Sequence, residues 1–400
     1  MPKIEEIKAL EQQADVLFQN IAGWETSTLR RIGNRIKQTG EMSVGDRAAL
    51  NNIAIVKQDM KEINRELAKV TGLNVRQLQA IYSGVIAAEH AANKYLFDYR
   101  NVKYIPFAEN RRLQAIVKAY AKSTAETMIN LANTKALYLR APNGRFVKMQ
   151  AGYLKILDKA VMQAGTGAET FHTAMRETIR QLGGGGVTVN YGSGVMRRLD
   201  TVIRQSLLWG AKQAGTAYSQ MVGQELGCDG VEIDWHTNPR PTHEFIQGRQ
   251  FVVGESRTIN GEFWQGTDSI DPTSIDAMTP NDALNDYGCL HYTSPIICGV
   301  SEPRYSKAEL ETLNEQNAME YTIDGKKYSG YDVTQMQRRL ESATREQKTI
   351  RETAKAAGDD ELAAQCTARI LAYRDRYDEL TRLTGIPQDL KRMSVTKARS

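Results

Sequence analysis

The chain has 400 residues, of which 41% are hydrophobic and 25% charged, and its 52 basic and 47 acidic side chains give a net charge of +5. The length is sufficient for two or three domains, and the composition is typical of a globular protein. The small excess of positive charge is far below that of a dedicated nucleic-acid-binding protein with its dense basic stripe. No apolar run reaches the ~18 residues of a membrane span, the N-terminus lacks the layout of a signal peptide, and the four cysteines do not form a disulfide framework. We therefore expect a soluble, intracellularly made protein without a membrane segment.

Residues 1–107 are expected to form a helical docking arm. Apolar residues recur at spacings of three and four, and this pattern predicts amphipathic helices over residues 3–22, 27–37, 44–71 and 74–99. Ser43 or Asp46 is expected to cap the third of these helices, which ends at Gly72. Residues 102–107 predict a linker.

The next segment, residues 108–226, is also predicted to be mostly helical. Its apolar periodicity predicts helices over residues 109–137, 151–164, 168–182 and 195–226. The glycine run at residues 183–186 precedes a short β-ribbon. A glycine run before a helix can bind phosphate, but the Lys-Ser/Thr ending of a P-loop is missing, so we expect a flexible turn.

Residues 227–305 predict a compact β-rich module. Strands are expected over residues 231–235 and 251–253, followed by a long polar loop over residues 254–287. Together with the preceding ribbon, these strands give a β-rich knot at about residues 187–305. The module holds three of the five histidines and three of the four cysteines, namely His236, His243, His291, Cys228, Cys289 and Cys298.

The C-terminal part divides into residues 306–385 and a basic tail, residues 386–400. Ser306 is expected to cap a helix, the Asp324-Gly turn predicts a hairpin, and Gly358 separates two antiparallel helices. These elements are predicted over residues 308–319, 321–328 and 332–383. The predicted fold class is mainly α with a small α+β central module, long N-terminal helices and a C-terminal helical hairpin.

The histidines and cysteines of the module are candidates for a metal site. His236, His243, Cys289 and His291 offer nitrogen and sulfur donors, the ligands that zinc prefers. Zinc sites are usually recognised by ligand pairs two to four residues apart, and neither Cys289-x-His291 nor the interval between His236 and His243 fits that spacing. We expect these side chains to be buried and hydrogen-bonded around a small sheet, with no cofactor.

A thiol triad is a catalytic alternative for the same residues. Cys289 would act as the nucleophile, with His243 or His291 as the base and Asp234 behind it. Nothing next to Cys289 predicts the strained turn or helix N-terminus that would lower the pKa of its thiol. The sequence therefore favours a structural role for Cys289.

Clustered carboxylates are a second catalytic alternative, because acids bind the divalent cations of nucleases. Asp229, Glu232 and Asp234 lie close together in the sequence. Glu232 and Asp234 alternate with apolar residues, so we expect them on the solvated face of a strand. Arg240, which could hold an anion, is expected to form an internal salt bridge. The sequence thus predicts a protein that is not an enzyme.

Several stretches of the chain resemble the phage minor capsid protein 2 family, which belongs with the Mu F-like head morphogenesis proteins. They are GCDGVEIDWH, RPTHEFIQGR and YGCLHYTSPIICGVSEPRYS, together with the long helix before them and YSGYDVTQMQRRLESATREQK and TGIPQD after them. The resemblance covers roughly residues 158–393, and the family's frequent Asn-Cys-Arg-His reads Gly-Cys-Leu-His at residues 288–291. The positions that carry the family motif are Asp234, Arg240, His243, Gly248, Cys289, His291 and Pro295.

The resemblance implies a minor structural protein of a tailed-phage virion, located in the capsid interior or at the portal vertex. It implies the portal or major capsid protein as partners, several copies around a symmetric vertex, and a role in head morphogenesis or in DNA packaging and ejection. It implies no established catalysis.

Two other functions stay open beside this one. The first is a metal hydrolase or injected effector that uses the Cys/His module, and the second is an internal head protein that binds DNA non-specifically. Contacts with DNA phosphates would then come from the basic tail, through Lys391, Arg392, Lys397 and Arg399.

Overall fold

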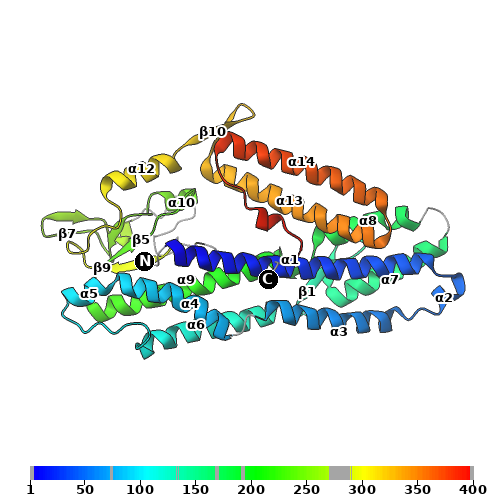
Figure 1. Cartoon of the computed structure of the whole chain (residues 1–400), viewed down its shortest axis with the longest axis horizontal. Helices are drawn as coiled ribbons and strands as arrows, with labels where there is room; N and C mark the ends of the chain where they lie inside the picture. Colours follow the sequence, from blue (N-terminus) through cyan, green and yellow to red (C-terminus); the bar gives the residue numbers. More distant parts are fainter. Residues whose placement is uncertain are drawn as a thin grey trace. The chain divides into compact units, whose positions relative to one another are not determined.

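The computed structural model describes residues 4–72, 75–131, 133, 135–166, 171–190, 194–269, 289 and 291–396. The chain is mainly helical with small antiparallel sheets in its central part, which confirms the predicted fold class (Figure 1). The α-helices are α1 (Ile4–Glu41), α2 (Val44–Ala48), α3 (Asn52–Thr71), α4 (Val75–Ala92), α5 (Lys94–Tyr99), α6 (Arg111–Leu131), α7 (Met149–Thr166), α8 (Phe171–Gly185), α9 (Leu199–Leu226), α10 (Pro241–Glu244), α12 (Lys307–Asn317), α13 (Gly330–Ala357) and α14 (Asp360–Thr384). Two short 3-10 helices are η1 (Thr267–Ser269) and η2 (Leu390–Met393).

The strands of the described residues form small antiparallel sheets. The strands are β1 (Leu137–Arg140), β2 (Phe146–Lys148), β3 (Thr188–Asn190), β4 (Met196–Arg198), β5 (Gly230–Ile233), β6 (Gln250–Val252), β7 (Arg257–Ile259), β8 (Glu262–Trp264), β9 (Thr293–Ile296), β10 (Glu320–Ile323) and β11 (Lys326–Ser329). Their orders are β2-β1-β3-β4, β6-β5-β9, β7-β8 and β10-β11.

The chain divides into two compact units, each built from segments that are far apart in the sequence. Unit 1 comprises residues 1–14, 73–125 and 205–335, and unit 2 comprises residues 15–72, 126–204 and 336–400. The helices α1, α6, α9 and α13 contribute residues to both units. The domain boundaries expected from the sequence stay a prediction.

The two predicted helices over residues 3–22 and 27–37 are a single helix, α1, and that prediction was wrong. The residues between them are held by packing in unit 2. Trp24 is 1% exposed and donates from Nε1 to the Ile63 carbonyl of α3 at 3.2 Å. Most apolar stripe residues of α1 and α3 in unit 2 are buried inside the chain, with Ile53 of α3 exposed at 65%, so internal packing accounts for most of the length of these stripes. The stripe residues buried in unit 2 include Leu17, Phe18, Ile21, Met60, Ile63 and Leu67.

The predicted helix over residues 44–71 is two helices, and each has its own N-cap. Ser43 caps α2 by accepting from Asp46 N, which confirms one of the two expected caps. Asn51 caps α3 by accepting from Ala54 N at 3.0 Å, so a new helix begins there. As predicted, α3 ends at Gly72.

A four-stranded sheet in unit 2 was only partly predicted. Helix α6 ends at Leu131, six residues before the predicted end, and Leu137, the last residue of the predicted helix, begins β1 instead. Leu137 and Leu139 are both 0% exposed and alternate with less buried neighbours. This alternation covers only four residues, which is too short for the sequence pattern to predict a strand. The predicted ribbon is present as β3-β4, so α9 begins at Leu199, four residues later than expected.

The glycine run at residues 183–186 is not a flexible turn, because its first three residues form the last turn of α8. A Cβ on Gly183 would lie 2.7 Å from the Cα of Ile350 in α13, so the helices approach too closely there for any side chain. Only Gly186 has a positive φ, of 62°, as the chain leaves the helix. The run therefore serves packing within unit 2.

The C-terminal elements follow the prediction closely. Ser306 and Glu309 form a capping box at the start of α12, and Asp324 and Gly325 both have positive φ in the turn between β10 and β11. Figure 1 shows α13 and α14 as the expected neighbouring pair, and Gly358 lies between them with a φ of 80°. Of the predicted loop over residues 254–287, the structure describes β7, β8 and η1; residues 270–287 lie outside the described part.

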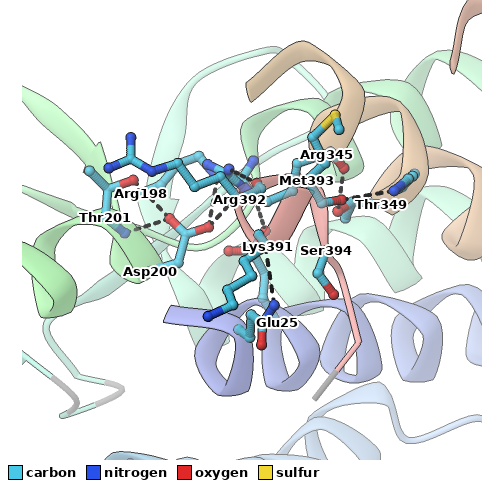
Figure 2. A network of polar contacts seen from close by, with 12 residues as sticks. Glu25, Arg198, Asp200, Thr201, Arg345, Thr349, Lys391, Arg392, Met393 and Ser394 are labelled. Carbon is cyan, nitrogen blue, oxygen red and sulfur yellow. Dashed lines mark hydrogen bonds and ion pairs between the residues drawn. The ribbon is translucent and has the colours of Figure 1, made fainter. Parts of the chain in front are cut away.

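Residues 386–396, assigned to the basic tail, pack onto unit 2. Arg345 donates to the carbonyl of Arg392 at 2.7 Å (Figure 2). Lys348 donates to the carbonyl of Met393 at 2.9 Å. Met393 is 5% exposed. Two cationic side chains of α13 thus hold this segment by its backbone.

The same arginine belongs to a buried ion network that joins three chain segments of unit 2. Asp200 lies 3.1 Å from Arg345 Nε and 3.6 Å from Arg198 Nε, and it accepts from the backbone N of Thr201 (Figure 2). Arg198 also pairs with Glu25 of α1. Asp200 and Glu25 are both 0% exposed, so the network is shielded from solvent.

Stability should depend on pH through Glu25, because burial raises its pKa from 4.5 to about 7 despite Arg198. The folded protein then holds a proton that the unfolded chain releases between pH 4.5 and 7. Glu25 therefore favours folding fully below pH 4.5, and this contribution falls by at most about 1.4 kcal/mol per pH unit as pH rises to 7. We expect Glu25→Gln, which cannot ionise, to gain stability relative to wild type over this window, as measured by urea unfolding at several pH values. An equal pH dependence in both proteins would contradict the assignment.

Candidate functional site

The sheet β6-β5-β9 positions the candidate site in unit 1. Strand β5 pairs antiparallel with both neighbours, with Val231 opposite Phe251 of β6 and Pro295 of β9. Pro295 is tolerated because β9 is an edge strand of this sheet. Ile233, Ile246, Phe251 and Cys289 form a buried apolar cluster beside it.

Strand β9 is packed on helix α9 by close contacts. A Cβ on Gly215 would lie 2.8 Å from the ring of Tyr292, and Ser219 donates to the carbonyl of Thr293. Ser294 of β9 also donates to Glu89 of α4 at 2.5 Å. The chain that enters β9, including His291, is therefore held against the face of α9 that carries Gly215 and Ser219.

Three of the four metal-ligand candidates converge next to this sheet. Cys289 Sγ lies 3.9 Å from His243 Nδ1 and 3.6 Å from His291 Nδ1. All three residues are buried, with exposed fractions of 2% for His243, 2% for Cys289 and 4% for His291. His243 comes from α10, whereas Cys289 and His291 come from the chain just before β9, so distant segments form the cluster.

Gln247 determines which nitrogen of His291 carries the proton. Its Oε1 accepts from the backbone N–H of His236 at 3.0 Å, and the same oxygen lies 3.1 Å from His291 Nε2. Because Oε1 only accepts, His291 Nε2 must be the donor. The lone pair of His291 is then on Nδ1, which faces Cys289.

His291 is neutral in this site. Burial lowers its pKa to about 3, since the nearby Asp234 offsets only part of the desolvation and the rings of His236 and His243 lower it further. The lone pair on Nδ1 of His291 is therefore free of a proton throughout the physiological pH range.

His236, the fourth candidate, binds Asp234 instead. His236 Nε2 lies 3.1 Å from Asp234 Oδ2, and Asp234 Oδ1 accepts from Tyr292 N at 2.8 Å. Burial disfavours the charge of Asp234, but His236 and the Tyr292 N–H outweigh it and keep its pKa below the usual value. The Asp234 carboxylate therefore orients His236 and the start of β9.

The expected solvated face of β5 was wrong. Glu232 and Asp234 are each 5% exposed, because neighbouring segments cover the strand on that side. Glu232 accepts from Arg304 N at 2.7 Å, and burial raises its pKa. Both acids serve internal hydrogen bonds.

Lys212 and Gln247 are site residues that sequence reasoning missed. Lys212, on α9, is 3% exposed, and its Nζ has no hydrogen-bond partner among the described residues. Burial lowers its pKa, and Cys289 gives the strongest opposing interaction. A cavity of about 470 Å³ lies alongside, and its lining includes Lys212, Thr216, Gln220 and His291.

The remaining motif residues shape the backbone around the site. Arg240 is the N-cap of α10, and its carbonyl accepts from His243 N at 2.8 Å. Gly248 has a φ of 70°, and its N–H donates to the Ile233 carbonyl at 2.9 Å. A glycine at 248 allows this tight return to β5. The salt bridge expected for Arg240 stays a prediction.

Of the residues proposed to contact DNA, the two that the structure describes belong to unit 2. Lys391 and Arg392 are in η2, and Arg392 Nε lies 2.9 Å from Asp389 Oδ2. Lys397 and Arg399 lie outside the described residues.

Comparison with known proteins gives the chain a family. Within the described residues, no helix combines the length and apolar character needed to cross a bilayer. No curated protein and no solved structure was found to match the chain. The model of a family of phage structural proteins, described as "Phage minor capsid protein 2", matches residues 8–381, which include every motif residue named above. The chain therefore belongs to the phage minor capsid protein 2 family.

Proposed function

We propose that this chain is a low-copy structural component of a tailed-phage head, of the Mu F-like type, bound at the portal vertex or to the capsid interior. It acts in head morphogenesis, or in DNA packaging and ejection, through the portal or major capsid protein. The observation that carries this proposal is the family match, which spans residues 8–381 and so reaches both units.

Two features of the chain support a structural role. Each unit is assembled from three separate segments, and unit 2 is tied together by the ion network around Asp200. In addition, the histidines and acids of the central module are engaged in internal contacts that hold the sheet. A closely packed chain of this kind is rigid and can present surfaces of fixed shape to neighbouring proteins.

A stop codon early in the gene, complemented from a plasmid, tests the proposal. Without complementation we expect heads that are misassembled or lack DNA, and with it we expect infectious particles that retain the chain. Quantitative mass spectrometry of purified, DNA-filled heads should give a constant ratio of a few copies per head. Normal infectious heads formed without the chain would contradict the structural role. An enzyme, in contrast, would be needed for infection without being retained at a constant ratio.

Contact with packaged DNA remains a second, compatible proposal. It would use Lys391, Arg392 and the last residues of the chain, although Arg392 also pairs with Asp389. Binding through phosphates must weaken steeply as salt increases. An affinity for duplex DNA that is unchanged between low and high salt would exclude it.

A further inference from the structure

We propose that His243, Cys289 and His291 bind one zinc ion, or a divalent metal of similar preference, as a three-ligand centre in unit 1. This inference does not depend on where in the virion the chain is located. It rests on the spacing of the donor atoms, on their burial and on the tautomer of His291.

The spacing of the donor atoms is close to that of a tetrahedral zinc site. Zinc lies about 2.3 Å from a cysteine sulfur and about 2.0–2.1 Å from a histidine nitrogen, so tetrahedral angles put sulfur and nitrogen ~3.5 Å apart. The observed Sγ–Nδ1 distances are 3.6 Å to His291 and 3.9 Å to His243. Ligand atoms of all three residues lie within 4.8 Å of one another. A small closure around the ion would complete the geometry.

The ring of His291 is already prepared for a metal. Its Nε2–H donates to Gln247, which leaves the unprotonated Nδ1 directed at the Cys289 sulfur. Metal-binding histidines usually donate their second nitrogen to an oxygen in this way, and such a bond fixes the ring and the tautomer. Gln247 is fixed in turn by the backbone N–H of His236.

Three protein ligands leave a fourth coordination position. Asp234 is not free to fill it, because its two oxygens accept from Tyr292 and contact His236. The cavity of about 470 Å³ is lined by His291 and Lys212, so a water molecule from this side can complete the tetrahedron. The ion would join α10 to the chain that enters β9.

Metal content and cobalt spectroscopy of the purified full-length chain test the proposal. We expect one equivalent of zinc after dialysis against metal-free buffer, and one equivalent of Co²⁺ after exchange. Bound Co²⁺ should show a thiolate-to-cobalt charge-transfer band and the intense d–d bands of a tetrahedral site. Wild type that is folded by circular dichroism and binds neither ion stoichiometrically would overturn the proposal, as would bound Co²⁺ without the charge-transfer band.

Substitutions then assign the ligands. Cys289→Ser should abolish the charge-transfer band, whereas Cys228→Ser, a half-buried cysteine outside the cluster, should keep it. Gln247→Leu should weaken zinc binding by about 10–100-fold and keep the band, because Gln247 only positions His291. Should Cys289→Ser fail to fold, retention of the wild-type band in Cys228→Ser, Cys298→Ser and Cys366→Ser still assigns the thiolate to Cys289 by elimination, and loss of the band in any of these three would overturn the assignment. Persistence of the band in folded Cys289→Ser would overturn the assignment.

Discussion

Asp200→Ala is expected to lower the free energy of unfolding of unit 2 by about 3–5 kcal/mol, the usual cost of removing one partner from a buried ion pair. Asp200 is 0% exposed and contacts both Arg198 and Arg345, whose side chains are only 19% and 5% exposed. Burial opposes ionisation of Asp200, but the two arginines outweigh it and lower its pKa. Without this carboxylate, two guanidinium groups would remain in a poorly solvated site with Glu25 as a weak partner.

Urea denaturation followed by circular dichroism measures this effect, with Asp375→Ala as the matched control. Asp375 is an exposed aspartate on α14 of the same unit, so its replacement should change stability by no more than about 0.5 kcal/mol. Because Arg345 also holds the backbone of Arg392, Asp200→Ala should in addition increase proteolysis near residue 392. Equal stability of the two variants would show that the network contributes nothing net.

Asp234→Ala is expected to destabilise unit 1 by about 3–5 kcal/mol, because it leaves His236 and the Tyr292 N–H without their buried acceptor. The loss of stability should be largest between about pH 4 and 6.5, because both partners are charged there and each loses its contribution on a different side of this window. The pKa of His236 is raised, since Asp234 outweighs burial, so its contribution is present below its unfolded pKa and is lost as pH rises. The pKa of Asp234 is lowered, so its contribution is lost as pH falls.

Asp234→Asn separates charge from hydrogen bonding at this position. The Asn oxygen can still accept from Tyr292 N, and its amide can donate to a neutral His236, so a smaller loss of about 1–2 kcal/mol is expected. NMR titration should show the pKa of His236 falling in this variant. Glu262→Ala, an exposed acid of β8 in the same unit, is the control for a surface change. An unchanged His236 pKa in Asp234→Asn would contradict the pairing.

Local signals in the sequence predicted the C-terminal part well. Short-range backbone signals determine these elements, namely the capping box of Ser306 and Glu309, the Asp324-Gly325 turn and the break at Gly358. Such signals can be recognised from a few consecutive residues of the sequence. The errors lie where tertiary packing overrides such signals. Glycines normally weaken a helix, yet Gly183 is helical because Ile350 packs against it.

The cluster of His243, Cys289 and His291 could be predicted only as a set of candidates. Zinc motifs are recognised from paired spacings, and here the pairing of β5 with β9 brings together donors that are far apart in the chain. Lys212 had no signal of its own, because a lysine in a long helix is normally solvated. Lys212 lies one helical turn before Gly215 and two turns before Ser219, on the face of α9 that packs against β9. This position indicates that Lys212 is buried near the site only once the contact between α9 and β9 is known.

The position of the chain in the virion is the most direct test of the proposed function. A short tag inserted between Asp324 and Gly325, in an exposed turn, leaves both cores intact and can be located by electron cryomicroscopy of purified particles. We expect label inside the capsid, concentrated at one vertex, in a few copies per DNA-filled head. Infectious particles that contain no label, or that carry it only on the tail, would contradict the proposed role in the head.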